Sequence, residues 1–163
     1  MPPKTLLIAG DIGPRPSNEQ YFIAGDLESL LGEALLAIWR NSDARIFNLE
    51  CLICDDRLSP LAKDGPNLYA KSETIRGITS LKPSLITLAN NHVLDYGKAG
   101  IDQTLTALAG SDISYIGVGE NVGSLIKTDV LLVGDKRIGF YAVAESEESV
   151  ATKQYAGANP YDD

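Results

Sequence analysis

The stretch LITLANNHVLDYG, residues 85–97, joins a short apolar run to a group of polar side chains. The run Leu85–Ala89 has the length and composition of a strand buried in a sheet. Asn90, Asn91 and His92 end the run, and Asp95 follows just beyond. Because ligands of open α/β sheets bind beyond the carboxyl ends of the strands, this stretch predicts a strand that leads into a binding site.

Two earlier apolar runs end in the same way. Thr5–Ala9 leads through Gly10 to Asp11, and Ala44–Leu49, which contains Asn48, leads to Glu50. Each run is short enough for a buried strand. If the three strands are parallel neighbours, their polar ends meet at one edge of the sheet.

Helices are expected between these strands. In the clearest one, Asp26 is a good N-cap, and apolar residues recur with the helical period of 3.6; they are Leu27, Leu30, Leu31, Ala34, Leu35 and Ile38. Further helices are expected at 72–81 and 98–109, a strand at 114–116, and a hairpin with strands at 129–133 and 137–144. This order predicts an α/β fold with a mainly parallel sheet, in one domain spanning residues 1–163.

The residues at the strand ends suit a cation. Asp11 and Glu50 offer carboxylates, Asn91 an amide oxygen and His92 an imidazole, and Mg²⁺, Mn²⁺, Fe²⁺ and Zn²⁺ accept such mixed ligands. The alternative is that Asp and Asn form turns through bonds to the backbone, and that His92 is a structural histidine. Three strand ends that agree are harder to explain as separate turns, and both interpretations stay open.

The composition excludes some functions. The formal net charge of −8 argues against a nucleic-acid partner, but it is compatible with a small phosphate-bearing substrate because a bound cation reverses the local field. No apolar segment is long enough for a membrane span, and the run after Lys4 is too short for a signal peptide. We therefore expect a cytoplasmic location. The turn at Gly117-Val118-Gly119 could cradle a phosphate, but it lacks the full glycine fingerprint.

Cys51 and Cys54 have the spacing C-x-x-C. Such a pair is compatible with a redox motif or half a zinc site. A structural zinc site needs four ligands, and the sequence has no second cysteine pair and only one histidine. Incidental apolar thiols are the favoured interpretation, and the role of the pair is left open.

Five strings occur in an order and spacing that resemble the CapA family of poly-γ-glutamate capsule biosynthesis proteins, relatives of the dinuclear metallophosphoesterases. The strings are Gly10-Asp11, Asn48-Leu49-Glu50, Lys63-Asp64-Gly65-Pro66-Asn67, Ala89-Asn90-Asn91-His92-x-x-Asp95-Tyr96-Gly97 and Gly117-x-Gly119-x-Asn121. The resemblance extends from Leu6 to about Ala144. It implies the N-terminal half of a four-layer α/β/β/α metallophosphoesterase-like sandwich.

The resemblance also implies roles. Asp11, Glu50 and Asn91 would bind divalent metal, and a pair of metals would activate a water. His92 would be catalytic and would either protonate the leaving oxygen or steady the phosphoryl group. The residues that would support this first set are Asn48, Asn90 and Asp95. The chain departs from the metallophosphoesterase pattern at Asp11-Ile12-Gly13, where Asp-x-His is usual, and it has no second histidine. We therefore expect a domain that is incomplete at its C-terminal end and inactive alone.

Two functions follow from the resemblance. The first is a metal-dependent hydrolase acting on a phosphoester or on a related bond of polyglutamate metabolism. The second is a non-catalytic accessory or assembly protein with a structural or degenerate metal site. Because the hairpin strands at 129–133 and 137–144 are partly apolar on both faces, a missing half-domain or self-association is expected to cover them.

Overall fold

The computed structural model describes residues 3–55, 57–145 and 148–161, so Met1 and Asp163, the ends of the expected domain, lie outside the described residues. Its main sheet has four strands in the order β1-β2-β5-β6, and every neighbouring pair is parallel. The strands are β1 (Leu6–Ile12), β2 (Ala44–Leu49), β5 (Leu85–Thr87) and β6 (Tyr115–Ile116). The predicted α/β class with a parallel sheet is confirmed.

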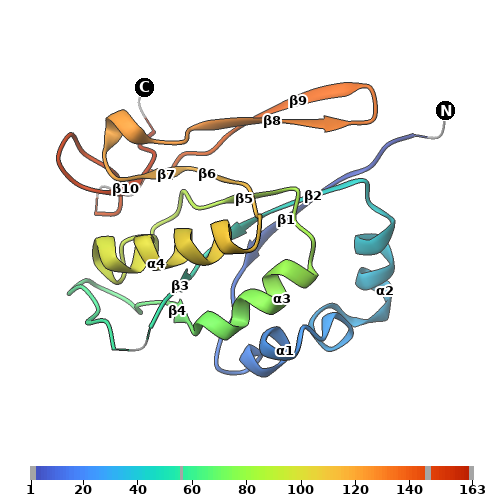
Figure 1. Cartoon of the computed structure of the whole chain (residues 1–163), viewed down its shortest axis with the longest axis horizontal. Coiled ribbons are helices and arrows are strands. Elements are labelled where there is room, and N and C mark those ends of the chain that lie inside the picture. Colours follow the sequence, from blue (N-terminus) through green and yellow to red (C-terminus); the bar gives the residue numbers. More distant parts are fainter. Residues whose placement is uncertain (1–2, 56, 146–147, 162–163) are drawn as a thin grey trace.

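Helical segments connect these strands. Between β1 and β2 lie α1 (Glu19–Ala24) and α2 (Leu27–Asn41), and α4 (Gly97–Gly110) leads from β5 to β6. The connection from β2 to β5 contains the short parallel pair β3 (Leu52–Ile53) and β4 (Tyr69–Ala70), then η1 (Ser72–Thr74) and α3 (Ile75–Ser80). The helix expected at 72–81 therefore begins as a 3-10 turn. Figure 1 shows α1, α3 and α4 on one side of the main sheet.

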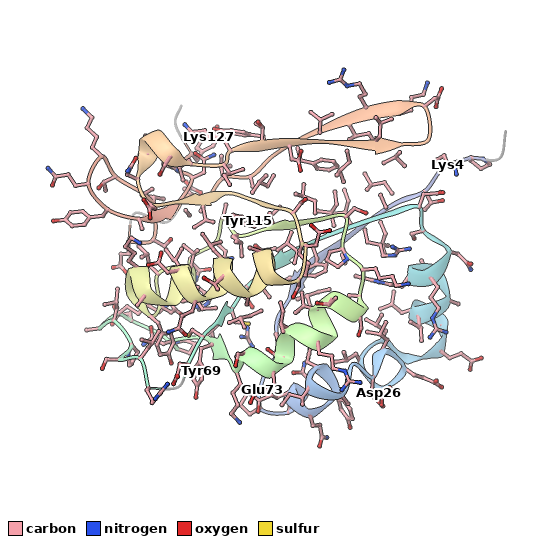
Figure 2. All side chains as sticks on the ribbon, in the orientation of Figure 1. Lys4, Asp26, Tyr69, Glu73, Tyr115 and Lys127 are labelled. Carbon is pink, nitrogen blue, oxygen red and sulfur yellow. The ribbon has the colours of Figure 1, made fainter. Side chains whose placement is uncertain are left out.

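The other side of the main sheet carries a hairpin of β8 (Thr128–Val133) and β9 (Lys136–Tyr141). A second small sheet pairs β7 (Val118–Gly119) with β10 (Gly157–Ala158), and η2 (Val122–Ser124) follows β7. The hairpin turn lies near the amino end of β1, because a Cβ added to Gly134 would meet the Lys4 side chain. Lys4 is labelled at that end in Figure 2.

Apolar side chains bury the main sheet on both faces, as its near-continuous apolar strands require. On the helical face, Phe47 and Ile86 belong to the larger core cluster. On the opposite face, Ile46 and Leu85 pack in a smaller cluster with Ala142, which Leu131 and Phe140 of the hairpin adjoin. The described residues thus form a helical layer, the main sheet and the hairpin, while the four-layer sandwich stays a prediction.

The outer side of the hairpin is apolar and exposed. Val130 is 47% exposed, Leu132 72% and Tyr141 59%, and on β1 Ile8 is 67% exposed. The three hairpin side chains Val130, Leu132 and Tyr141 are called the apolar patch below.

The predicted apolar stripe of α2 is wrong in its second half. Gly32 has φ 70° and ψ 162°, which interrupts the helix. Beyond this kink the buried side chains are Leu36 and Trp39, whereas Leu35 is 43% and Ile38 56% exposed. The periodicity assumed a straight helix, and the kink turns a different set of residues towards the core.

Candidate functional site

A bulge in β1 places Asp11 at the site. Ile8 pairs with Ile46 and Asp11 with Asn48, so β1 has one more residue than β2 between these pairs. Gly10 lies in this segment with φ 70°, a conformation that favours glycine. The strand therefore continues to Ile12 instead of ending at Ala9 as the sequence predicted. Asn48 Nδ2 donates to Asp11 Oδ1 at 2.8 Å, which fixes one oxygen of that carboxylate.

Asn90 joins the ends of β2 and β5. Its Nδ2 donates to Asn48 Oδ1 at 3.1 Å and to the Leu49 carbonyl at 2.9 Å. Its Oδ1 accepts from the His92 backbone amide at 2.9 Å. Asn90 thus holds the turn that presents Asn91, and this turn is the bonding pattern that the alternative interpretation of the Asn residues expected.

A pocket of about 490 Å³ opens at this edge of the main sheet. Thr87, Ala89 and residues 141–143 at the end of β9 line it together with five of the predicted residues, which are Asp11, Asn48, Glu50, Asn90 and Asn91. Five of the seven predicted site residues therefore meet at this pocket, whereas His92 and Asp95 lie outside its lining.

His92 and Asp95 form a buried cluster with Lys63. Asp95 is 1% exposed, and its Oδ2 lies 2.8 Å from His92 Nδ1 and accepts from the Leu68 amide at 2.6 Å. The Lys63 ammonium pairs with the other Asp95 oxygen and lies 3.2 Å from His92 Nδ1. Nδ1 is thus engaged, and within the described residues Nε2 has no hydrogen-bond partner. Lys63 had no role in the sequence reasoning, although the string Lys63–Asn67 contains it.

Arg15 was also missed. Its Nη2 donates to Glu50 Oε2 at 2.6 Å. Asn18 Oδ1 accepts from the Arg15 amide at 2.6 Å, and the Arg15 carbonyl accepts from the amides of Asn18 and Glu19. The only sequence signal was a cation four residues after Asp11, and nothing in the spacing connects it with a residue 35 positions away.

The two cysteines are buried free thiols. Burial raises the pKa of Cys51 to about 12 and that of Cys54 to about 11. Because the thiolate is the nucleophile and the metal ligand, these raised pKa values support the interpretation as apolar thiols.

The Gly117–Gly119 turn offers little to a phosphate. The Gly117 amide donates to the Ile126 carbonyl at 2.6 Å. The amides of Gly123 and Ser124 donate to Asn121 Oδ1 at 2.8 and 3.1 Å, forming the cap of η2. Since internal acceptors hold these amides, this region stabilises its own turn.

The pocket fits a hard cation better than a histidine-rich metal centre. Among residues 3–55, 57–145 and 148–161, no three His, Cys, Asp or Glu side chains are placed to hold a metal ion. Asp11 and Glu50 each have one oxygen outside the hydrogen bonds described above, and the Asn91 side chain is exposed at the pocket. Mg²⁺ is commonly held by one or two carboxylates, with water and substrate phosphate completing its shell. The set is therefore suited to a single oxygen-ligated cation.

Fold and pocket define a parallel α/β domain with an acidic, amide-rich pocket at the carboxyl edge of its sheet. Residues 5–162 match the family described as "Bacterial capsule synthesis protein PGA_cap". The chain belongs to this family, and the resemblance to CapA proteins is confirmed.

Two relatives illustrate the match. A probable polyglutamine synthesis accessory protein of Mycobacterium tuberculosis (strain ATCC 25618 / H37Rv) is 31% identical over 127 residues, which are 77% of this chain and 33% of the relative. The capsule biosynthesis protein CapA of Bacillus anthracis is 32% identical over 124 residues, 73% of this chain and 30% of the relative. The matched region is thus about a third of each relative's length.

None of the helices described in this chain has the length and apolar character needed to cross a membrane. The cytoplasmic location stays a prediction.

Proposed function

We propose that this chain takes part in the synthesis of a capsule or polyglutamate polymer, and that its pocket binds a divalent cation together with a phosphoester or polyglutamate-related substrate. The names of its relatives support the first part. The second part is carried by one observation: Asp11, Glu50 and Asn91, which lie at the carboxyl ends of three neighbouring strands of one sheet, line the same pocket.

In this proposal the site is that of a metal-dependent hydrolase of the metallophosphoesterase type. Asp11, Glu50 and Asn91 would hold the cation, which as Mg²⁺ or Mn²⁺ would polarise a phosphoryl oxygen and lower the pKa of a bound water. Asn48 orients Asp11 through its 2.8 Å hydrogen bond, and Asn90 fixes the turn before Asn91. His92 would deliver a proton through Nε2, since Asp95 and Lys63 occupy Nδ1.

A non-catalytic accessory role is the second candidate. His92 is only 8% exposed and lies in a buried ion-paired cluster, which is what a structural histidine requires. The described residues also provide only two carboxylates at the pocket. A cation held there would then order the strand ends for a partner rather than activate water.

Calorimetric titration with Mn²⁺ tests the pocket. Asp11→Asn and Glu50→Gln should each weaken Mn²⁺ binding by about tenfold or more, because each removes one charged ligand. Asp135→Asn removes a carboxylate at the hairpin turn, at the opposite end of β1, and should leave binding unchanged. Equal affinities for all four proteins, or no binding by any of them, would reject the cation site.

A hydrolysis assay then separates the two roles. With Mn²⁺ present, turnover of a chromogenic phosphodiester that disappears in Asp11→Asn supports the hydrolase. Mn²⁺ binding without turnover supports the accessory role for this chain.

A further inference from the structure

The Arg15 side chain places a positive charge next to the pocket. Glu50 lines the pocket, whereas Arg15 does not. The guanidinium nevertheless reaches the carboxylate, with Nη2 donating to Glu50 Oε2 at 2.6 Å. The pair is partly buried, with side-chain exposures of 33% and 27%. Because the pair is partly buried, solvent and salt screen its charges less than those of an exposed ion pair. The positive charge of Arg15 therefore acts on the pocket.

The second amino group of the guanidinium, Nη1, lies in an unfavourable environment. Nη1 is buried and has no hydrogen-bond partner among the described residues. A Cβ added to Gly13 would lie 3.6 Å from Nη1 and 3.5 Å from the Cys51 sulfur, so the group occupies the space beside a glycine that has no side chain. An unsatisfied buried donor is destabilising. The contact with Glu50 is the interaction in this structure that offsets that cost.

The backbone of Arg15 is held in a turn. Its amide donates to Asn18 Oδ1 and its carbonyl accepts from two amides at 2.9 and 2.7 Å. The turn fixes the point from which the side chain reaches Glu50, and the Nη2–Oε2 contact orients the guanidinium. It stands at the carboxylate that the proposed cation would also need.

We infer that Arg15 is a built-in counter-ion of Glu50, which competes with a divalent cation for this carboxylate and so restrains metal loading of the pocket. The inference rests on the proposed cation site. Asp11, Glu50 and Arg15 together carry a net charge of −1, so one divalent cation already exceeds the local charge and a second is disfavoured. A cation held by the other Glu50 oxygen would share the charge of this carboxylate with Arg15, so the positive guanidinium reduces the observed metal affinity.

Mn²⁺ titration of Arg15→Gln tests this competition. The variant should bind Mn²⁺ about tenfold more tightly than the wild type, since a hydrogen bond to a charged group no longer opposes the metal. Arg57→Gln is the matched control, because it removes the same charge from another Arg–carboxylate pair, with Asp55, away from the pocket; its affinity should equal that of the wild type. The double variant Arg15→Gln/Glu50→Gln should bind Mn²⁺ no more tightly than Glu50→Gln alone, because the carboxylate that Arg15 contacts is then absent.

The outcomes separate the two proposals. If the wild type binds Mn²⁺ and Arg15→Gln binds it equally or more weakly, the counter-ion inference is wrong and the cation site stands. If neither protein binds Mn²⁺, both fail. Titrating ¹⁵N-labelled wild type with Mg²⁺ gives a second measurement that needs no folded variant: the guanidinium signals of Arg15 should shift with saturation while those of Arg57 do not. Unchanged Arg15 signals at saturating Mg²⁺ overturn the inference.

Discussion

Replacing Asn90 with alanine should damage both the stability of the chain and its proposed cation site. The side chain makes three hydrogen bonds, to Asn48 Oδ1, to the Leu49 carbonyl and from the His92 amide. Leu49 is 1% and His92 8% exposed, so water has limited access to the groups that lose their partner. No other side chain described here ties the end of β2 to the turn after β5 in this way.

The size of the effect follows from these bonds. A neutral hydrogen bond contributes about 1 kcal/mol net, and the half-buried position of Asn90 lets water replace part of the loss, so we expect about 2 kcal/mol of destabilisation. For a domain of this length that corresponds to a fall of about 4–8 °C in melting temperature. Because residues that orient metal ligands typically affect affinity by 10–100-fold, Mn²⁺ binding should weaken by about tenfold.

Thermal unfolding followed by circular dichroism and Mn²⁺ calorimetry measure the two effects. Asn121→Ala is the matched control: Asn121 also accepts and organises several hydrogen bonds, but these cap η2. Removal of the Asn121 side chain should lower the free energy of unfolding by about 1 kcal/mol and leave Mn²⁺ affinity unchanged. Wild-type melting and wild-type affinity in Asn90→Ala would show that the hydrogen-bonded turn does not hold the pocket together.

Three further predictions concern the rest of the molecule. Burial raises the pKa values of Cys51 and Cys54 from 9.0 to about 12 and about 11. The stability that their neutral thiols contribute is therefore complete below pH 9 and is lost as the pH rises through 11–12. In urea unfolding across this pH range, the double alanine variant should lose less stability than the wild type. Leu132→Lys, in the apolar patch, should reduce self-association seen by light scattering, and a wild type that is monomeric at high concentration contradicts this. Thr104→Val should cost about 1–3 kcal/mol in urea unfolding because the Thr104 hydroxyl accepts from the buried Ile53 amide, whereas Thr106→Val on the exposed side of α4 should change little.

The parts of the fold that depend on local pattern could be predicted from the sequence. The apolar runs before Asp11, Glu50 and Asn90 became β1, β2 and β5, because burial on both faces of a parallel sheet requires such runs. Their parallel order then brought the polar ends to one edge.

The parts of the fold that depend on single backbone conformations could not be predicted from the sequence. The positive φ of Gly10 and of Gly32 changes which neighbouring residues face the sheet or the core, and a glycine in a sequence does not reveal whether it uses this freedom. At Gly10 the result is a bulge that keeps Asp11 in the strand. At Gly32 the result is a helix whose buried side chains change from the predicted stripe.

The ion pairs at the site were equally hidden. Arg15 and Glu50 are 35 residues apart, and Lys63 and Asp95 are 32 apart. Neither distance follows a helical or strand period, so only the folded chain brings the charges together. Lys63 comes from the long segment between β3 and β4, and no pattern in the sequence indicates what that segment contacts.

These pairs define the electrostatic problem of the pocket. A phosphoester and a polyglutamate are both anions, and the pocket presents Asp11 and Glu50 within a chain of net charge −8. Arg15 offsets the charge of Glu50, but its guanidinium is already bonded to that carboxylate. Lys63 is committed to Asp95 in the adjoining cluster. Under the proposed function an anionic substrate would meet a negative surface until a divalent cation reverses the field, so substrate binding would require the cation as much as hydrolysis would.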